Sequence, residues 1–516
     1  MNPYDRNRVL ATIFTAALVI LLTTFKPALS MELRSYHITC NPDEFEYINS
    51  HPDENIYIDC TFEFNGDEWN DARFRIRGES SRQYPKKSYK VNFDAHNRFR
   101  NRDKLNLISE YTDASFAREF LSYDFYHRAG LLASRTWFAR LYVNGTYMGL
   151  YLDVEQIDEC FLGAAGLPRD ATIYKADVDG CLLRTSDRID EVWQKKTNLE
   201  TGWYDLLELI EWLDTVPLEW FFDELDGYFD REELARIIAV NGVIGNTSTY
   251  YHNYYLIHDH GQDGLWRMLP WDIDRTFRYY YSFTSPGFYR CYRWNLGTNI
   301  LISNCWRNRE MRELIYDQMQ GLVDSLFRED YYRAMSDTLS ELLYQAVRDD
   351  SLKAFTLDRF TVEIDSFPIF ADRRGAAIID MMTEYAAPFD LERAIITPAG
   401  VFFSWDSTFV PDGSPFSYNV IVSTEPTLPV NNRIEIGNLH NTYLLYDELG
   451  AGTYYWKVRA LTNRASKTSC LNYNSAFPVP ENGFNATVVD GQINESTTLT
   501  AAQSPYSLPD GLTVAA

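Results

Sequence analysis

The stretch from Gly245 to Phe277 places the tightest constraint on the fold of this chain. Two runs rich in β-forming residues, Tyr254–Ile257 and Leu265–Leu269, flank the polar sequence HDHGQDG with its two glycines. This arrangement predicts a β-hairpin. Asn253 precedes the first strand and Asp272 follows the second, so pairing of the strands would bring these two side chains together.

The base of this hairpin is a candidate metal site. Asp272 and Asp274 are two residues apart, so on an extended backbone they would point to the same face. With the amide oxygen of Asn253 they form an oxygen set suited to Mg²⁺, with phosphate as the remaining ligand. The alternative is solvated carboxylates at a strand end. The bulky Trp271 and Phe277 favour the metal, because carboxylates in an apolar segment need a counter-charge.

Composition limits the classes of partner. The 516 residues are enough for two to four domains, and a hydrophobic content of 45% is ample for buried cores. The formal net charge of −25 argues against binding to nucleic acid or to anionic membranes. The acidity is equally compatible with adaptation to a salty habitat.

Residues 1–30 have the pattern of a Sec-type signal peptide. Arg6 and Arg8 precede an apolar run, and Ala28 and Ser30 are small residues at the positions needed for cleavage before Met31. The alternative is an uncleaved N-terminal anchor. No later stretch is long and apolar enough to span a bilayer, so we expect no stable membrane span after cleavage. The expected location is secreted, on the cell surface or periplasmic.

The cysteines are compatible with disulfide bonds in an exported chain. No two cysteines form a CxxC motif, so the sequence does not have the pattern of a zinc ribbon. Closeness in the sequence favours the disulfide pairs Cys40–Cys60, Cys160–Cys181 and Cys291–Cys305. Cys470 would then be unpaired.

A basic turn interrupts the N-terminal strands. The sequence RIRGESSRQYPKKSYKVNFD, residues 75–94, places Gly78, Ser80 and Ser81 between two alternating segments. Small residues let backbone N–H groups approach an anion, and the lysines that follow make this the densest basic cluster in an acidic chain. The turn is therefore either a phosphate-binding hairpin or an ordinary exposed hairpin with solvated charges.

The remaining patterns indicate an α+β chain with a separate β module. A helix is expected within residues 103–130, capped by Asp113 or Ser115, and further helices within residues 200–245 and 308–390. Asn144-Gly145 predicts a type I′ hairpin turn. After Pro398 the alternating segments FSWD and GAGTYYWKVRA resemble a fibronectin type III module, a small all-β sandwich.

Four segments, in this order, resemble the CotH family of spore-coat-type atypical protein kinases. They are RIRGESSRQYPKKSYKVNF, LNLISEYTDASFAREFLSYDF, LYVNGTYMGLYLDVEQID and GNTSTYYHNYYLIHDHGQDGLWRMLPWDIDRTF. The resemblance implies a distorted, two-lobe protein-kinase-like domain that uses ATP and Mg²⁺ or Mn²⁺. The expected domains are a signal peptide at 1–30, the kinase-like domain at 31–395, the β-sandwich at 396–480 and a flexible tail at 481–516.

The resemblance also implies roles for single residues. Gly78, Ser80 and Ser81 would form the phosphate-facing turn. Lys86 or Lys87 would hold the nucleotide phosphates, and Glu155 would lie near the nucleotide base. The metal ligands would be Asn253 and Asp272, with Asp274 as a further candidate. The substrate would be a serine of a secreted or surface protein.

One position departs from the family pattern. Members commonly carry an aspartate five residues before the asparagine that corresponds to Asn253, and here that residue is Ser248. A serine does not accept a proton as a carboxylate does. His252 is near in sequence, but its position predicts that it points to another face. The alternatives to a kinase are therefore a nucleotide-binding pseudokinase, an enzyme that transfers another part of ATP such as AMP, and a surface scaffold or adhesion protein.

Overall fold

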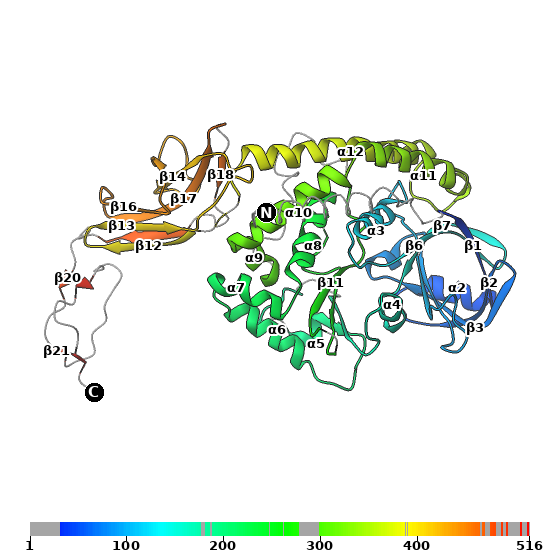
Figure 1. Cartoon of the computed structure of the whole chain (residues 1–516). Helices are drawn as coiled ribbons and strands as arrows, with labels where there is room; N and C mark the ends of the chain where they lie inside the picture. Colours follow the sequence, from blue (N-terminus) through cyan, green and yellow to red (C-terminus); the bar gives the residue numbers. More distant parts are fainter. Residues whose placement is uncertain are drawn as a thin grey trace, which may run out of the picture.

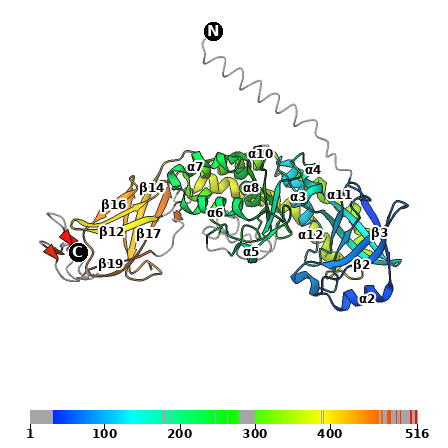
Figure 2. The ribbon, with the colours of Figure 1, turned by 90° about the horizontal axis from the view of Figure 1, so that it is seen from below.

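A computed structural model shows an elongated chain with a barrel at one end, helices in the middle and β-sheets at the other end (Figures 1 and 2). The long helix α12 (Leu357–Glu384) runs along the molecule towards the C-terminal sheets (Figure 1). The structure describes residues 31–176, 181–185, 188–246, 248–261, 263–277, 299–387, 389, 391–464, 467–469 and 475–480, with short strands beyond. The predicted signal peptide and most of the predicted tail lie outside the described residues.

The N-terminal part is a closed barrel in the strand order β1-β2-β3-β4-β5-β7-β6, in which β1 and β6 are parallel. Strict alternation builds it: Phe74, Ile76, Tyr89 and Val91 fill the interior, and the residues between them face outwards. Its strands are β1 (Leu33–Cys40), β2 (Ile58–Phe64), β3 (Asp67–Arg77), β4 (Ser88–Asn92), β5 (Lys104–Ile108), β6 (Thr136–Val143) and β7 (Thr146–Glu155). Helix α2 (Pro42–Ser50) and the 3₁₀ turn η1 (Ser80–Gln83) connect them.

Local signals set several element ends. Asp113 accepts hydrogen bonds from the backbone N–H groups of Ala117 and Arg118 and so caps helix α3 (Arg118–Arg128). Asn144 and Gly145 both have positive φ, 48° and 78°, which confirms the type I′ turn between β6 and β7. These ends follow from side chains within a few residues, and the sequence therefore predicted them.

The middle of the chain packs a sheet, in the order β11-β10-β8-β9, among helices. Helix α8 is buried on nearly every face and runs directly into the predicted hairpin. The strands are β8 (Thr172–Ala176), β9 (Trp193–Lys195), β10 (Tyr254–His258) and β11 (Trp266–Pro270). The helices are α4 (Glu159–Ala164), α5 (Ile189–Val192), α6 (Tyr204–Thr215), α7 (Leu218–Glu224), α8 (Arg231–Ile244), α9 (Ile300–Arg307), α10 (Arg309–Ser325) and α11 (Glu329–Asp349), with the 3₁₀ turn η2 (Leu225–Gly227) after α7.

The C-terminal strands form two antiparallel sheets that share one hydrophobic cluster around Trp405 and Trp456. The first sheet begins at Leu391, so this part starts before the predicted boundary at residue 395. The assignment as a fibronectin type III module stays a prediction. The strands are β12 (Leu391–Thr397), β13 (Gly400–Trp405), β14 (Phe416–Ser423), β15 (Ile434–Leu439), β16 (Tyr443–Tyr446), β17 (Gly452–Thr462), β18 (Lys467–Ser469) and β19 (Ser475–Val479), followed by two-residue strands β20 (Thr487–Val488), β21 (Gln492–Ile493), β22 (Tyr506–Ser507) and β23 (Thr513–Val514).

The proposed cysteine pairs are not bonded in this structure. Cys40 and Cys60 face each other across β1 and β2, yet both are free thiols, as are Cys160 and Cys305. Cys291 lies outside the described residues. Among the described helices, none is both long enough and apolar enough to cross a bilayer.

Candidate active site

The hairpin forms as predicted, and it brings Asn253 and Asp272 together. Strands β10 and β11 pair with Tyr254 opposite Pro270, and the N–H of Trp271 donates to the carbonyl of Asn253 at 3.2 Å. We call Asn253 and residues 271–274 the hairpin base. Buried Trp271 and Ile273 anchor it in the core. The metal-ligand candidates from sequence therefore meet at one place.

The reason given for pairing Asp272 with Asp274 was wrong. Asp272 has φ 53° and Asn253 has φ 59°, so both occupy the left-handed region rather than an extended backbone. Asparagine and aspartate tolerate this conformation better than other side chains, and such backbone positions are frequent at functional sites. The two aspartates nevertheless lie near one shared neighbour, Glu119 of α3, since both raise its pKa electrostatically.

Glu110 and Glu119, which sequence reasoning missed, complete a carboxylate cluster with Asp272 and Asp274. Both glutamates are buried, and burial followed by the nearby carboxylates raises the pKa of Glu119 to about 8 and that of Glu110 well above its usual value. Glu110 Oε1 and Glu119 Oε2 have no hydrogen-bond partner among the described residues. Buried carboxylates normally have a cation or a donor beside them, so these unpartnered oxygens are suited to a bound cation.

Arg77 and Lys90 supply the positive side of the same site. The guanidinium of Arg77 lies 5.7 Å from the Trp271 ring centroid. Burial lowers its pKa, although Asp272 and Glu119 oppose this. Lys90 projects outwards from β4 because Tyr89 and Val91 point into the barrel. Its Nζ donates to Gln156 Oε1 at 3.0 Å.

The surroundings of Lys90 disfavour the charged, ammonium form of its side chain. Burial, and then the positive charges of Arg77 and Arg75, lower the pKa of Lys90 to about 6. An anion placed beside it would remove this penalty, since an opposite charge favours the ionised form. Lys90 is therefore the lysine of this surface that is suited to an incoming phosphate group.

The two lysines predicted from the family pattern are engaged elsewhere. Lys86 is fully buried, and its Nζ binds Asp350 Oδ2 at 2.8 Å and the Leu150 carbonyl at 2.5 Å. This ion pair fastens the barrel to the end of α11. Lys87 Nζ donates to the Arg82 carbonyl at 2.5 Å and so braces the turn before it. Lys86 is thus already ion-paired inside the fold, and its assignment to the nucleotide phosphates stays a prediction.

Glu155 is also directed away from the site. It ends β7 as predicted, but its carboxylate accepts from the backbone N–H and the guanidinium of Arg135. Together with Phe120 and Thr136 it lines a cavity of about 370 Å³ on the other side of α3. The next residue, Gln156, faces Lys90 instead. The residue beside the proposed nucleotide site is therefore Gln156, one position further along the chain.

The turn after β3 has the backbone freedom that its glycine predicts. Gly78 has φ 103°, and a Cβ atom there would lie 2.1 Å from Ser81 Oγ. Ser80 is exposed and Ser81 half-buried. Because Gly78 directly follows Arg77, the turn starts next to the residue that lies over Trp271. The structure thus places these small residues at the edge of the site.

Ser248 and His252 lie together, which corrects the expectation that His252 points elsewhere. Ser248 Oγ is 3.1 Å from His252 Nε2 and accepts a hydrogen bond from Asn253 Nδ2, also at 3.1 Å. The Ser248 N–H donates to Asn246 Oδ1, which holds this loop after α8. An imidazole ring therefore lies beside Ser248, the position at which the family pattern has an aspartate.

The chemistry of these donors fits a divalent cation such as Mg²⁺. The cluster offers carboxylate oxygens, including the unpartnered atoms of Glu110 and Glu119, and the backbone of Asn253 is hydrogen-bonded to Trp271, next to Asp272. The oxygens of this cluster are further apart than in a closed metal site. Among the described His, Cys, Asp and Glu residues, groups of three with ligand atoms within 4.8 Å of one another occur elsewhere, at Asp205, His258 and His260 and at Asp103, Asp158 and Cys160.

Comparisons with known proteins agree with the motif series. Residues 74–378, more than half of the chain, match the family described as CotH kinase protein. The chain is 28% identical over 321 residues to inner spore coat protein H of Bacillus subtilis (strain 168), covering 61% of this chain and 88% of that protein. 

Two solved structures show weaker likeness. One is the Helicobacter pylori proinflammatory kinase CtkA, with 10% identity, a TM-score of 0.25, and coverage of 63% of this chain and 94% of that one. The other is a Shewanella oneidensis complex of HipA, HipB and operator DNA, with 10% identity, a TM-score of 0.24, and coverage of 56% and 57%. These TM-scores are too low to establish a shared fold. The match over residues 74–378 does establish the family: the chain belongs to the CotH kinase proteins.

Proposed function

We propose that this chain binds ATP with Mg²⁺ or Mn²⁺ at the hairpin base and transfers the terminal phosphoryl group to a serine of an exported or surface protein. The observation that carries the proposal is the meeting of Arg77 and Lys90 with the carboxylate cluster of Glu119, Asp272 and Asp274. Phosphoryl transfer needs cations on the phosphates and oxygen ligands for a metal, and both face one site here.

In this proposal the cationic side chains bind phosphate and the oxygen-bearing side chains bind the metal. Lys90 and Arg77 would bind and orient the phosphate oxygens. Asp272 and Asn253 would hold the metal, which neutralises the β- and γ-phosphate oxygens when bound. Glu119 would complete this shell or orient it from α3. His252 would accept the proton of the attacking serine hydroxyl in the place of the missing aspartate.

Export and the C-terminal sheets extend this proposal. The N-terminal pattern favours a signal peptide, and the similarity to a spore coat protein favours a surface-associated location. We further propose that the two C-terminal sheets form a fibronectin type III-like sandwich that spaces or attaches the catalytic part.

The test is thermal melting of the purified chain with and without MgATP, followed by transfer of label from γ-labelled ATP. A ligand that binds only the folded state raises the melting temperature. Asp272→Asn should abolish this rise and the transfer. Asp365→Asn, which removes an exposed carboxylate on α12, is the matched control and should change neither.

The second candidate is a nucleotide-binding pseudokinase, and Ser248 is the observation that favours it. A melting shift without label transfer would support this candidate or the transfer of another part of ATP, which α-labelled ATP would reveal. The absence of any shift at millimolar MgATP would contradict every nucleotide function and leave a surface scaffold.

A further inference from the structure

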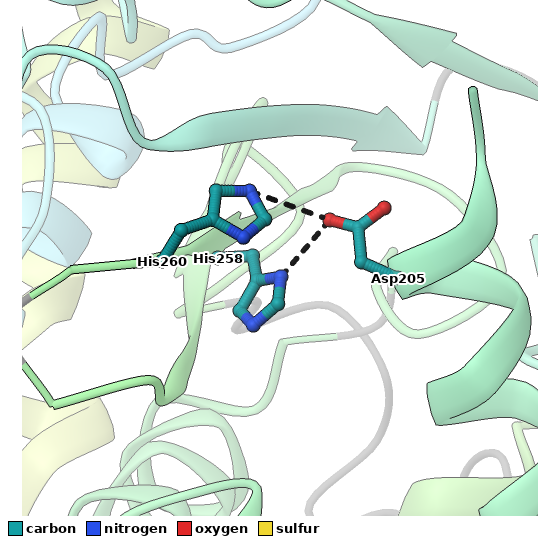
Figure 3. Close-up of side chains that lie close together, drawn as sticks. All are labelled: Asp205, His258 and His260. Carbon is teal, nitrogen blue, oxygen red and sulfur yellow. Dashed lines mark hydrogen bonds and ion pairs between the residues drawn. The ribbon is translucent and has the colours of Figure 1, made fainter. Parts of the chain in front are cut away.

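A second cluster of ligating side chains lies at the opposite end of the same hairpin (Figure 3). Asp205 comes from the first turn of α6, His258 ends β10, and His260 follows in the turn. His258 Nδ1 is 2.9 Å from Asp205 Oδ2, and His260 Nε2 is 3.7 Å from the same oxygen. The HDHGQDG segment was predicted only to form a polar turn, and the proposed kinase site makes no use of it.

We propose that Asp205, His258 and His260 bind a transition-metal ion such as Zn²⁺, which fastens the tip of the β10–β11 hairpin to α6. Ligand atoms of the three residues all lie within 4.8 Å of one another. In a tetrahedral zinc site with bonds of about 2.1 Å, neighbouring donors are about 3.4 Å apart. The distances from Asp205 Oδ2 to His258 Nδ1 and to His260 Nε2, 2.9 and 3.7 Å, lie on either side of this value, so small side-chain adjustments suffice.

Neighbouring groups hold the donors in place before any ion arrives. The His258 ring stacks on Trp266, with centroids 4.2 Å apart and an interplanar angle of 6°. The hydroxyl of Tyr174 donates to the other carboxylate oxygen, Asp205 Oδ1, at 2.5 Å. Such outer contacts orient metal ligands and are part of functional metal sites. Thr172 Oγ1 lies 2.7 Å from His260 Nε2, and this contact would be exchanged for the metal bond.

The forms of these side chains that bind a metal ion are a carboxylate and neutral imidazoles. The His260 side chain is 46% exposed, so an ion has a path from solvent and a water can complete the coordination.

The donor set selects a different metal from that of the hairpin base. Two imidazole nitrogens with one carboxylate suit Zn²⁺, Ni²⁺ or Cu²⁺, whereas the oxygen cluster at Asp272 suits Mg²⁺. Tyr254 and His258 are four positions apart along β10, which corresponds to about 13 Å. The two sites are therefore separate, and this proposal does not depend on the proposed kinase activity.

The experiment measures Zn²⁺ binding to the metal-stripped chain, by calorimetry and by Co²⁺ absorption spectra with Zn²⁺ competition. The expected result is one saturable site with a Kd at or below the micromolar range and a tetrahedral Co²⁺ spectrum that excess Mg²⁺ does not displace. His260→Gln and Asp205→Asn should each weaken binding at least about tenfold. His440→Gln, at an exposed histidine of the C-terminal sheets, is the control and should leave it unchanged.

Two results would overturn the proposal. One is the absence of saturable Zn²⁺ binding in the folded wild-type chain, which would mean that the cluster is a hydrogen-bonded His–Asp group only. The other is equal affinity in wild type, His260→Gln and Asp205→Asn, which would place the ion elsewhere. Because the wild-type measurement alone can refute the site, the proposal stays testable even if a variant fails to fold.

Discussion

Lys90 gives the most direct test of the site, because its pKa links ligand binding to pH. In the free protein its pKa is lowered to about 6 by burial and by the positive charges of Arg77 and Arg75. A bound phosphate would restore the charge, so binding should take up a proton above pH 6. The affinity for ATP should therefore fall as the pH rises, since less Lys90 is protonated beforehand.

The size of this effect follows from the protonated fraction. About half of Lys90 is charged at pH 6 and about one part in a hundred at pH 8, so the affinity should fall about fifty-fold, or about 2.3 kcal/mol. An ordinary lysine with a pKa above 10 would stay charged throughout this range and give a flat profile.

Lys90→Arg is the control that isolates this residue. An arginine keeps its charge at all these pH values, while the nucleotide and the carboxylate cluster titrate as they do in wild type. Calorimetric titration with ATP at constant excess Mg²⁺ between pH 6 and 8 should show a steep loss of affinity in wild type and a much shallower one in Lys90→Arg. Equal slopes in the two proteins would refute the assignment of Lys90 to the phosphates.

Three further outcomes are expected. Lys86→Met should lower the free energy of unfolding in urea by about 3–5 kcal/mol, because it leaves the buried Asp350 unpaired, and a loss below about 1 kcal/mol would contradict this. His252→Gln should lower kcat for phosphoryl transfer about a hundredfold with unchanged ATP affinity; an unchanged kcat would show that it is not the base. Burial raises the pKa of the Cys60 thiol to about 12, so iodoacetamide should label it only after unfolding, and no label in the unfolded, unreduced chain would reveal a disulfide.

The sequence was most informative where a few neighbouring residues decide the structure. The hairpin at Gly245–Phe277, the Asn144-Gly145 turn and the cap at Asp113 all depend on local backbone preferences, and the structure confirms them. The family match adds the kinase assignment over residues 74–378. The predictions of ATP, metal and serine substrate remain to be measured.

The surroundings of Lys86 could not be predicted, because they depend on distant parts of the chain. Lys86 and Asp350 are 264 residues apart, and nothing near Lys86 in sequence announces its partner. One local signal did exist. The alternation of Tyr89 and Val91 places Lys90 on the outer face of β4, and Lys90 was already part of the basic cluster. Glu119 gave no comparable signal, since it meets Asp272 only through the packing of α3.

The replacement of the family aspartate by Ser248 removes a base but preserves an orienting contact. Ser248 Oγ accepts a hydrogen bond from Asn253 Nδ2, which leaves the Oδ1 atom of the amide on the other side as a metal ligand. A further carboxylate at this position would add negative charge to a site in which Glu119 is already difficult to ionise. A serine keeps Asn253 oriented without that charge, and His252 is the imidazole beside it. Under the proposed function, the departure from the family pattern would therefore change proton transfer and leave the proposed nucleotide and metal ligands in place.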